Sequence, residues 1–398
     1  MLDMISKSPL EKRLKRHVIG RTHAFFAATA PGLEALCFNE LASLRLSEEA
    51  PRIVSGGVRF NGRLSDGYIA NLVLRIPNRI LMRVTEFKTT NFRQLEKKLS
   101  GVAWELYFSP LADIHFSIKA KHSRLFHTSA ITDCFQKSIT TRLAGYQNQA
   151  TESRLDDMDN QRLFVRVVDD RFTISLDTSG ALLFKRGLKT VVGKAPLRET
   201  LASSALTFAG YSGTEPLIDP MCGSGTFSLE AAMIAQNIPP GFYREFAFMK
   251  WPSFRANQWA HIKKTYAARI VEAKTPSIFA SDNNPKMCHA IQEVSRKYGF
   301  FRVLEVSSKN FFDLLPLDYT PQRGVIILNP PFGMRLEPHG DKDKFYREII
   351  KKLKNDFKGW RIAMLVPDAK VMKKLPLQLK PYPIYHGGLN LSLLVGVI

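Results

Sequence analysis

The chain has 398 residues, 45% of them hydrophobic, and is therefore long enough for two or more domains with buried cores. Its 57 lysines and arginines outnumber 36 aspartates and glutamates, and the formal net charge of +21 favours a polyanionic partner such as nucleic acid over a neutral metabolite. Without a membrane-spanning apolar run, an export signal or a metal-ligand spacing among its four cysteines, the chain is expected to be cytoplasmic, metal-free and reduced.

The first part of the chain predicts a mixture of strands and helices. Residues 1–20 carry many basic side chains without a secure hydrophobic period, and we expect a mobile arm there. Apolar strands and amphipathic helices then alternate as far as residue 178, which favours one or two small α+β lobes. The expected strands are 25–28, 53–60, 80–85, 114–120, 163–168 and 172–176, and the expected helices are 31–44, 65–75, 95–99 and 131–143.

Residues 178–193 are expected to form a hinge, and after them strands and helices alternate regularly. Strands are expected at 217–218, 277–280, 303–306, 325–328 and 362–366, helices at 227–235, 285–298 and 344–357, and an insertion at 236–276. This alternation predicts a doubly wound α/β sheet, whose ligands bind beyond the carboxyl ends of its strands. The predicted organisation is thus a basic arm at 1–20, a mixed region at 21–178 and an α/β domain at 179–398.

A glycine-containing loop follows the first strand of the α/β domain. Gly223 and Gly225 let the backbone turn sharply and approach a ligand, and the helix that starts near Thr226 offers unpaired amides suited to a carboxylate. The loop lacks the lysine of a P-loop and the third glycine of a dinucleotide fingerprint. Asp282, after the second strand, is placed to accept hydrogen bonds from ribose hydroxyls. Two glycines can also form a simple turn.

A second motif, Asn329-Pro330-Pro331-Phe332, follows another apolar strand. The side-chain carbonyl of Asn329 and the backbone carbonyl of Pro330 could accept the N–H groups of a nucleobase amine and stabilise the charge that develops on it during methyl transfer. The two prolines stiffen the turn, and Phe332 offers a ring face on which a base can stack. A strand-terminating turn is the alternative interpretation.

Together these features resemble the guanine-N2 ribosomal RNA methyltransferases, in which a ferredoxin-like lobe and an RNA-binding THUMP domain, here expected at 21–178, precede a Rossmann-like class I methyltransferase domain, here expected at 179–398. The resemblance is carried by Lys185-Arg186-Gly187, by the segment 195–202, by the loop from Asp219 to Thr226 and by the segment 329–333; the segments 75–83 and 101–104 resemble THUMP sequences less specifically. It implies S-adenosylmethionine as cofactor and an RNA substrate, 23S ribosomal RNA first and tRNA as the alternative.

The resemblance also assigns residues to the site. The cofactor is expected at Asp219, Pro220, Cys222, Gly223, Gly225, Thr226, Asp282 and Asn283, and the target guanine at Asn329, Pro330, Pro331 and Phe332. Where the family often has an acidic residue near the cofactor adenine, this chain has Asn310 and, three residues on, Asp313, and the assignment between them stays open. Phosphate contacts are expected from Lys185, Arg186, Arg198 and Arg335.

Two other classes of function stay open at this point. Protein glutamine methyltransferases also use an Asn-Pro-Pro motif, although Phe332 stands where they usually have tyrosine. A non-catalytic RNA-binding assembly factor would keep the basic charge without needing both motifs intact. The nucleotide that is modified and the oligomeric state are not specified by the sequence.

Overall fold

The structure is a computed structural model that describes residues 9–146, 160–188, 197–273, 275–331, 342–367, 378–386 and 388–398. The chain forms two compact units, each assembled from separate stretches of sequence. Unit 1 comprises Met1–Thr29, Cys37–Leu183 and Glu245–Lys263, and unit 2 comprises Ala30–Leu36, Phe184–Arg244 and Lys264–Ile398. The division into parts at residues 20 and 178 stays a prediction.

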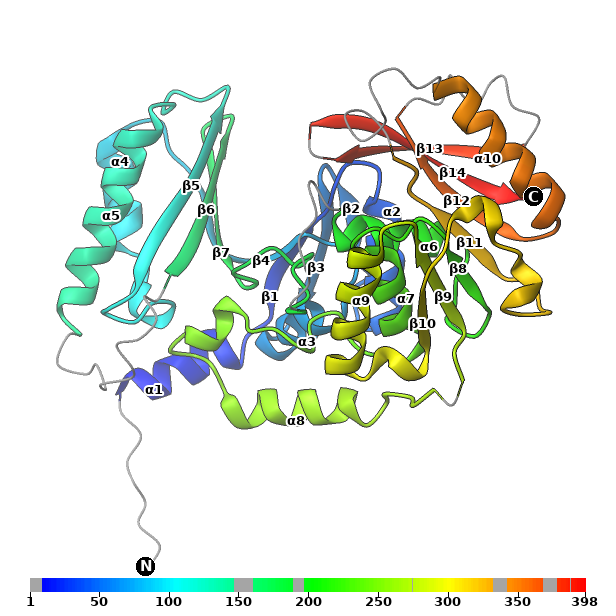
Figure 1. Ribbon diagram of the computed structural model, residues 1–398. Coiled ribbons are helices and arrows are strands. Elements are labelled where there is room, and N and C mark those ends of the chain that lie inside the picture. The colour runs from blue at the N-terminus through cyan, green and yellow to red at the C-terminus, as the bar shows by residue number, and fades with distance from the viewer. Residues whose placement is uncertain are drawn as a thin grey trace, which may run out of the picture. The chain divides into compact units, whose positions relative to one another are not determined.

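Unit 1 is built around one seven-stranded sheet, ordered β2-β3-β1-β4-β7-β6-β5 (Figure 1). All neighbouring strands are antiparallel except β5 and β6, and a bulge interrupts the register of β4 between Arg83 and Thr85. The strands are β1 (His23–Ala28), β2 (Arg52–Val54), β3 (Gly57–Gly62), β4 (Arg79–Lys88), β5 (Asp113–Lys121), β6 (Asn160–Val168) and β7 (Arg171–Asp177). The mixed first half therefore shares a single sheet.

Helices cover one face of this sheet. The helices of the first half are α1 (Pro9–Leu14), α2 (Glu34–Leu44), α3 (Leu64–Val73), α4 (Phe92–Ser100) and α5 (Thr128–Ala144). Figure 1 shows α4 and α5 beside β5 and β6, and their inward side chains Leu95, Leu99, Ile131 and Phe135 are fully buried. Burying these apolar stripes against the sheet supplies the main driving force for folding of the unit.

The stretch Glu245–Lys263, which the sequence places within the expected insertion, belongs to unit 1. It contains the start of α8 (Ala256–Ala267). Phe248 stacks on Tyr68 with ring centroids 4.2 Å apart, and the indole N–H of Trp251 donates to the side-chain oxygen of Gln161 at 2.9 Å. Aromatic packing and a satisfied buried hydrogen bond thus attach this stretch to unit 1.

Unit 2 has a second seven-stranded sheet, ordered β10-β9-β8-β11-β12-β14-β13. The first five strands of that order are parallel, β14 pairs antiparallel with both β12 and β13, and β13 therefore runs in the same direction as the first five. The strands are β8 (Leu217–Asp219), β9 (Ile278–Asp282), β10 (Leu304–Ser308), β11 (Val325–Leu328), β12 (Arg361–Val366), β13 (Lys380–His386) and β14 (Leu389–Val397). Because the order runs outward from β8 in both directions, the switch point lies between β8 and β11.

Both faces of the second sheet carry helices. Figure 1 shows α6 (Glu199–Phe208), α7 (Thr226–Ala235) and α9 (Pro285–Tyr298) on one side of the strands and α10 (Lys342–Asp356) on the other. Ile349 and Leu353 of α10 are fully buried in one cluster with Ile326 of β11 and Ile362 of β12. Short strands without polar alternation are the pattern of a sheet covered on both faces, and the predicted doubly wound architecture is confirmed.

Some expectations differ from the structure. Residues 9–14 form α1 and residues 15–19 a π-helical turn, because Leu14 and Val18 are buried, so this part of the expected mobile arm is folded. The sequence also did not indicate α6, α8, β13 or β14. Among the described helices, none combines the length and apolar character required to cross a membrane.

Candidate active site

A cavity of about 550 Å³ lies in unit 2 and brings the two motifs of the sequence together. Gly223 follows β8 and Asn329 follows β11, neighbouring strands on the two sides of the switch point. The full lining is Leu197, Pro220, Met221, Cys222, Gly223, Ser224, Thr226, Phe227, Asp282, Asn283, Asn284, Met287, Asn310, Phe311, Phe312, Asn329, Pro331 and Phe345. One crevice can therefore hold ligands of both motifs.

The two glycines of the loop meet different surroundings. Gly225 has φ +79° and precedes α7, and a Cβ there would lie 2.8 Å from Cγ1 of Ile291, so its lack of a side chain permits close packing on α9. Gly223 lines the cavity with φ +52°, and a Cβ there would meet no heavy atom within 4 Å. A ligand can approach the backbone at Gly223, whereas Gly225 shapes the turn from behind.

The start of α7 is a polar end of the cavity. Gly225 provides no side-chain cap for the helix, and the first two helical residues, Thr226 and Phe227, line the cavity. The unpaired amides of a first helical turn carry a partial positive charge. This end of the cavity is suited to a ligand carboxylate.

Asp282 is fixed at the end of β9 by two backbone donors. The N–H of Gly223 donates to Oδ2 and the N–H of Asn284 donates to Oδ1, each at 2.9 Å. Each carboxylate oxygen retains a further lone pair that can accept a hydrogen bond. With Asn283 also in the lining, the end of β9 offers acceptors to ligand hydroxyls.

Asp219 lies beneath the cavity and does not line it. Its side chain is fully buried, and Oδ2 accepts a hydrogen bond from the Ser228 hydroxyl at 2.5 Å. The pKa of Asp219 is raised to about 7, mainly by burial, with the hydrogen bond from Ser228 opposing the rise and the nearby Asp282 carboxylate adding to it. Asp219 therefore joins β8 to α7, and its expected contact with the cofactor stays a prediction.

Asn329 presents a polar atom with no visible partner. Its Oδ1 is buried and accepts no hydrogen bond from any described residue. Pro331 lines the cavity beside it, while Pro330 is buried and does not. Phe332 and Arg335 lie outside the described residues. An orphaned acceptor at this position is costly unless a ligand donates to it.

Asn310 and Asp313 are the two candidates for the contact with the cofactor adenine, and of these Asn310 lines the cavity and Asp313 does not. Asn310 caps a short 3₁₀ turn, with Oδ1 accepting from the N–H of Phe312 at 3.0 Å. Apolar walls that sequence reasoning missed come from Met287, Phe312 and Phe345. The adjacent Phe311 and Phe312 were the available signal for this wall, whereas nothing local marked Met287 or Phe345.

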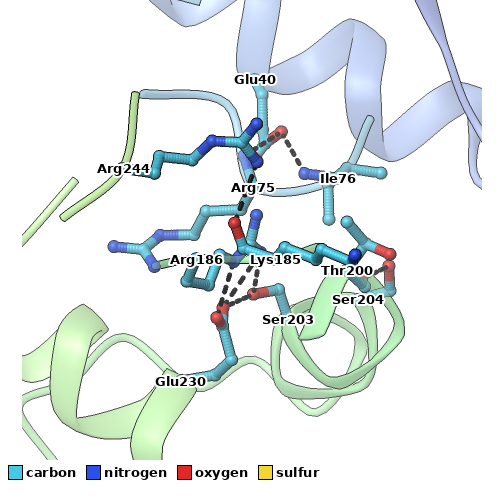
Figure 2. A network of polar contacts seen from close by, with 10 residues as sticks. All are labelled: Glu40, Arg75, Ile76, Lys185, Arg186, Thr200, Ser203, Ser204, Glu230 and Arg244. Atoms are coloured by element: carbon cyan, nitrogen blue, oxygen red, sulfur yellow. Dashed lines mark hydrogen bonds and ion pairs between the residues drawn. The ribbon is translucent and has the colours of Figure 1, made fainter. Parts of the chain in front are cut away.

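Arg186 is buried in a network of polar contacts (Figure 2). Its guanidinium pairs with Glu230 of α7 at 2.8 Å, both side chains are at most 2% exposed, and the Ser203 hydroxyl of α6 donates to the same carboxylate. The backbone oxygen of Lys185 accepts from Arg244 at 2.9 Å. A guanidinium this deeply buried and paired does not reach an RNA phosphate, contrary to the sequence-based expectation for Arg186.

The remaining basic candidates are more accessible. The Lys185 side chain is exposed, and Arg198 precedes α6 with its guanidinium 5.3 Å from the centroid of the Phe184 ring. All four cysteines are free thiols. The described ranges contain no group of three or more histidine, cysteine, aspartate or glutamate side chains that could hold a metal ion.

Comparison with known proteins assigns families to both parts of the chain. Residues 186–379 match the family model "RMKL-like, methyltransferase domain", and residues 24–81 match "RlmL ferredoxin-like domain". The ferredoxin-like expectation is thus confirmed for the start of unit 1, and the THUMP domain stays a prediction.

Known proteins and solved structures also match this chain over most of its length. A provisionally named RNA methyltransferase from Synechocystis is 30% identical over 94% of this chain and 96% of its own length. The ribosomal RNA large subunit methyltransferase K/L of Psychromonas ingrahamii is 33% identical over 92% of this chain, which spans only 49% of that protein. The solved structure of SMU.472, a provisionally assigned methyltransferase in complex with SAH, has a TM-score of 0.82 and 28% identity over 95% of this chain and 98% of its own.

The fold and the matches support the same conclusion. The two motifs meet in a cavity at the switch point of the second sheet, and the family model, the relatives and the solved structure are all named as methyltransferases. The chain belongs to the RMKL-like family of S-adenosylmethionine-dependent methyltransferases.

Proposed function

We propose that the chain transfers the methyl group of S-adenosylmethionine to the exocyclic N2 of a guanosine in 23S ribosomal RNA. The observation that carries the proposal is the buried Oδ1 of Asn329, which has no hydrogen-bond partner among the described residues and belongs to a residue that lines the same cavity as the glycine loop. The formal charge of +21 and the relatives named as large-subunit ribosomal RNA methyltransferases support an RNA substrate.

The cavity residues fit the cofactor. A volume of about 550 Å³ lies within the usual range for ligand pockets. The amides at the start of α7 suit the amino-acid carboxylate of the cofactor, and Asp282 suits its ribose hydroxyls. Asn310, which lines the cavity, is our choice over Asp313 for the adenine edge, with Phe312 and Met287 against the adenine ring. The bound cofactor supplies a strongly electrophilic methyl group.

Asn329 and Pro330 act on the nucleophile. The lone pair of a guanine amino group is delocalised into the ring, so the nitrogen is a poor nucleophile until its geometry becomes tetrahedral. The side-chain carbonyl of Asn329, which lines the cavity, and the backbone carbonyl of Pro330, a residue that is buried outside the cavity lining, are proposed to accept its two N–H groups, orient the lone pair toward the methyl group and stabilise the positive charge that develops. Phe332 is proposed to stack on the base, as the sequence suggests. The nitrogen–carbon bond would form as the sulfur–carbon bond of the cofactor breaks, SAH would be the leaving group, and the acidic methylated ammonium would lose one proton to water, so no strong base is required.

The RNA must present the guanine out of any base pair, because N2 takes part in pairing. Lys185 and Arg198 are proposed phosphate contacts, and Arg335, which lies outside the described residues, is proposed as a third. The cytoplasmic location expected from the sequence stays a prediction.

The first test removes the acceptor at Asn329. We expect Asn329→Ala to lower kcat for methyl transfer by about 10² to 10³, because a preorganised acceptor in a water-excluded site contributes that much to stabilising a transition state. Cofactor affinity, measured by calorimetry, should stay within about twofold of the wild type. The matched control is Asn390→Ala, which removes an exposed amide of the same unit.

The assay uses radiolabelled S-adenosylmethionine with transcribed 23S RNA, with tRNA and with a protein extract as separate acceptors, followed by mass spectrometry of the product. N2-methylguanosine in 23S RNA supports the proposal. Label on tRNA, on adenine N6 or on protein glutamine would overturn the substrate assignment, and normal turnover by Asn329→Ala would overturn the role of the acceptor. Absence of cofactor binding would favour a non-catalytic RNA-binding protein.

A further inference from the structure

The sheet of unit 1 has two chemically different faces. Because successive side chains of a strand point to opposite faces, and directly paired residues share a face, the strand registers define both sets. One face bears buried apolar residues such as Phe25, Met82 and Val165 under the helices. We call the other side the open face. Among the residues on it are Arg52 of β2, Arg59 of β3, Arg83, Glu86 and Lys88 of β4, Asp113, Lys119 and Lys121 of β5, Arg162, Phe164 and Arg166 of β6, Arg171 and Ser175 of β7, and Phe26 of β1.

The open face is strongly basic. Apart from the paired Arg79 and Asp177, it carries nine basic side chains and the two carboxylates Glu86 and Asp113, a difference of nine minus two, or +7; the nine are Arg52, Arg59, Arg83, Lys88, Lys119, Lys121, Arg162, Arg166 and Arg171. At the edge of this face, Arg79 and Asp177 form a buried pair that adds no net charge. All nine except the partly buried Arg83 are exposed.

Pairing of strands concentrates this charge. Arg52 lies directly opposite Arg59 across β2 and β3, and Lys119 lies opposite Arg166 across β5 and β6. Like charges directly opposite one another destabilise a sheet. Burial lowers the pKa of Arg83, and the neighbouring Arg59 and Arg166 guanidiniums lower it further, against the raising effect of Glu86. The face therefore retains a repulsive arrangement that an anion would relieve.

Carboxylates within the face neutralise little of it. Glu86 is shared by two guanidiniums, those of Arg83 at 2.6 Å and Arg171 at 2.8 Å. Within the described part of the chain, no carboxylate lies within ion-pair distance of Arg59, Arg162 or Arg166. These three cations are exposed and spread over β3 and β6, on different sides of the sheet centre.

The shape of the face favours an extended ligand. Seven strands at a spacing of about 4.8 Å give a surface roughly 29 Å wide. A hollow of about 180 Å³ lies on it, with Phe26, Arg59, Arg83 and Ser175 among its walls. Charge distributed over such a width suits a chain of phosphates more than one isolated phosphate, and half-buried Phe26 and Phe164 can support sugars or bases.

We propose that the open face of unit 1 binds the phosphate backbone of the RNA substrate. The proposal rests on the proposed function, because it takes the same RNA as its ligand. It assigns to unit 1 a contact that positions the RNA without reading its sequence. Binding at this face should depend strongly on salt, because each neutralised phosphate releases counterions.

The test replaces the three unpaired cations in the full chain with Arg59→Gln, Arg162→Gln and Arg166→Gln. The control replaces Arg93, Lys97 and Lys137, three exposed cations on α4 and α5 behind the sheet, with glutamine. Affinity for transcribed 23S RNA is measured by fluorescence anisotropy between 0.1 and 0.5 M salt. Three lost contacts should reduce the slope of log K against log salt by about 2, which corresponds to about a hundredfold weaker binding at 0.1 M relative to 1 M salt.

Methyl transfer separates this inference from the proposed function. We expect the triple variant to raise KM for RNA at least tenfold and to keep kcat and cofactor affinity, the reverse of Asn329→Ala. If the triple variant and the wild type have equal RNA affinity and an equal slope of log K against log salt, the proposal that the open face binds RNA is overturned, even where methylation is normal. Loss of binding to polyglutamate alone, with RNA binding unchanged, would also overturn it and identify an acidic protein as the partner. Absence of methyl transfer by the wild-type chain would overturn only the proposed function.

Discussion

Two glycines of one loop, separated by a single residue, support the site in different ways. Gly225 has a left-handed backbone and Ile291 directly behind its Cα, whereas Gly223 has a left-handed backbone and open space in the cavity before it. A side chain at Gly225 must therefore disturb α9, whereas a side chain at Gly223 must disturb a ligand in the cavity.

Alanine at each glycine should separate stability from binding. Gly225→Ala should lower the free energy of unfolding by about 2 to 3 kcal/mol, since left-handed strain of about 1 kcal/mol adds to the clash with Ile291. In an Ile291→Ala background, the same change should cost only the strain. Gly223→Ala should cost about 1 kcal/mol of stability and weaken cofactor binding more than Gly225→Ala does.

Denaturant unfolding and calorimetry with S-adenosylmethionine measure these effects. Additive costs of Gly225→Ala and Ile291→Ala would show that the close approach to α9 is unimportant. Cofactor affinity that falls more with Gly225→Ala than with Gly223→Ala would contradict the placement of Gly223 at the cavity.

At the residue scale, the sequence located the site but not every contact. Chemistry and spacing were sufficient for the glycine loop and Asn329, because each motif directly follows an apolar strand. The same reasoning could not distinguish a residue that lines a cavity from one that supports it, and Asp219 and Gly225 belong to the supporting group. Arg186 was misjudged because its partner, Glu230, is 44 residues away in the chain.

At the scale of elements, the contact between α6 and α7 places acidic groups near one another. Glu199 is the first residue of α6, and burial raises its pKa to about 7, with the Glu230 carboxylate of α7 adding to the rise and Arg186 opposing it. The ordinary pKa of this group is 4.5. The folded chain therefore binds a proton that the unfolded chain has lost between about pH 4.5 and 7. Stability contributed by this group falls as pH rises through that window.

Glu199→Gln should remove this pH dependence. Glutamine resembles the protonated acid, so the variant should be more stable than the wild type, and its advantage in the free energy of unfolding should grow by about 1 kcal/mol between pH 6 and pH 8. Urea unfolding at the two pH values measures it. Glu348→Gln, at an exposed position on α10, is the control. A constant advantage at both pH values would contradict a raised pKa for Glu199.

The sequence predicted those helices and strands whose apolar residues recur at a clear spacing. It did not predict the segments whose structure depends on packing against distant parts of the chain. The five parallel strands of unit 2 appear in sequence as short apolar runs between helices. The strand β13, which the sequence analysis did not predict, contains Pro381 and Pro383; it is an edge strand, where a missing N–H costs little. The sequence of Glu245–Lys263 contains no local sign that its aromatic residues pack in unit 1, because packing partners are not encoded by period.

At the scale of the whole molecule, net charge indicated a polyanion without showing where it binds. The basic residues of the open face come from six strands and are brought together only by the register of the sheet. No run of basic residues in the sequence marks them. Pairing of distant strands is the information that the composition lacks.

The two units also share helices. Helix α2 begins within the unit 2 stretch Ala30–Leu36 and continues into unit 1, and α8 begins in unit 1 and ends beyond Lys263 in unit 2. A helix is cooperative along its length, so loss of structure in one unit removes part of a helix from the other. We therefore expect the two units to unfold together, although each has its own core.

Cofactor binding tests this cooperativity. At a hundred times its Kd, SAH should stabilise the folded chain by about 2.7 kcal/mol, which raises Tm by about 3 °C if all 398 residues melt together and by about 6 °C if a unit of half that size melts alone. In Trp360→Phe, the remaining tryptophans, Trp104, Trp251 and Trp259, all report on unit 1. Their fluorescence midpoint should rise with SAH as much as the calorimetric Tm does. A fluorescence midpoint that SAH leaves unchanged, beside a calorimetric peak that it raises by about 6 °C, would instead show that the shared helices do not couple the units.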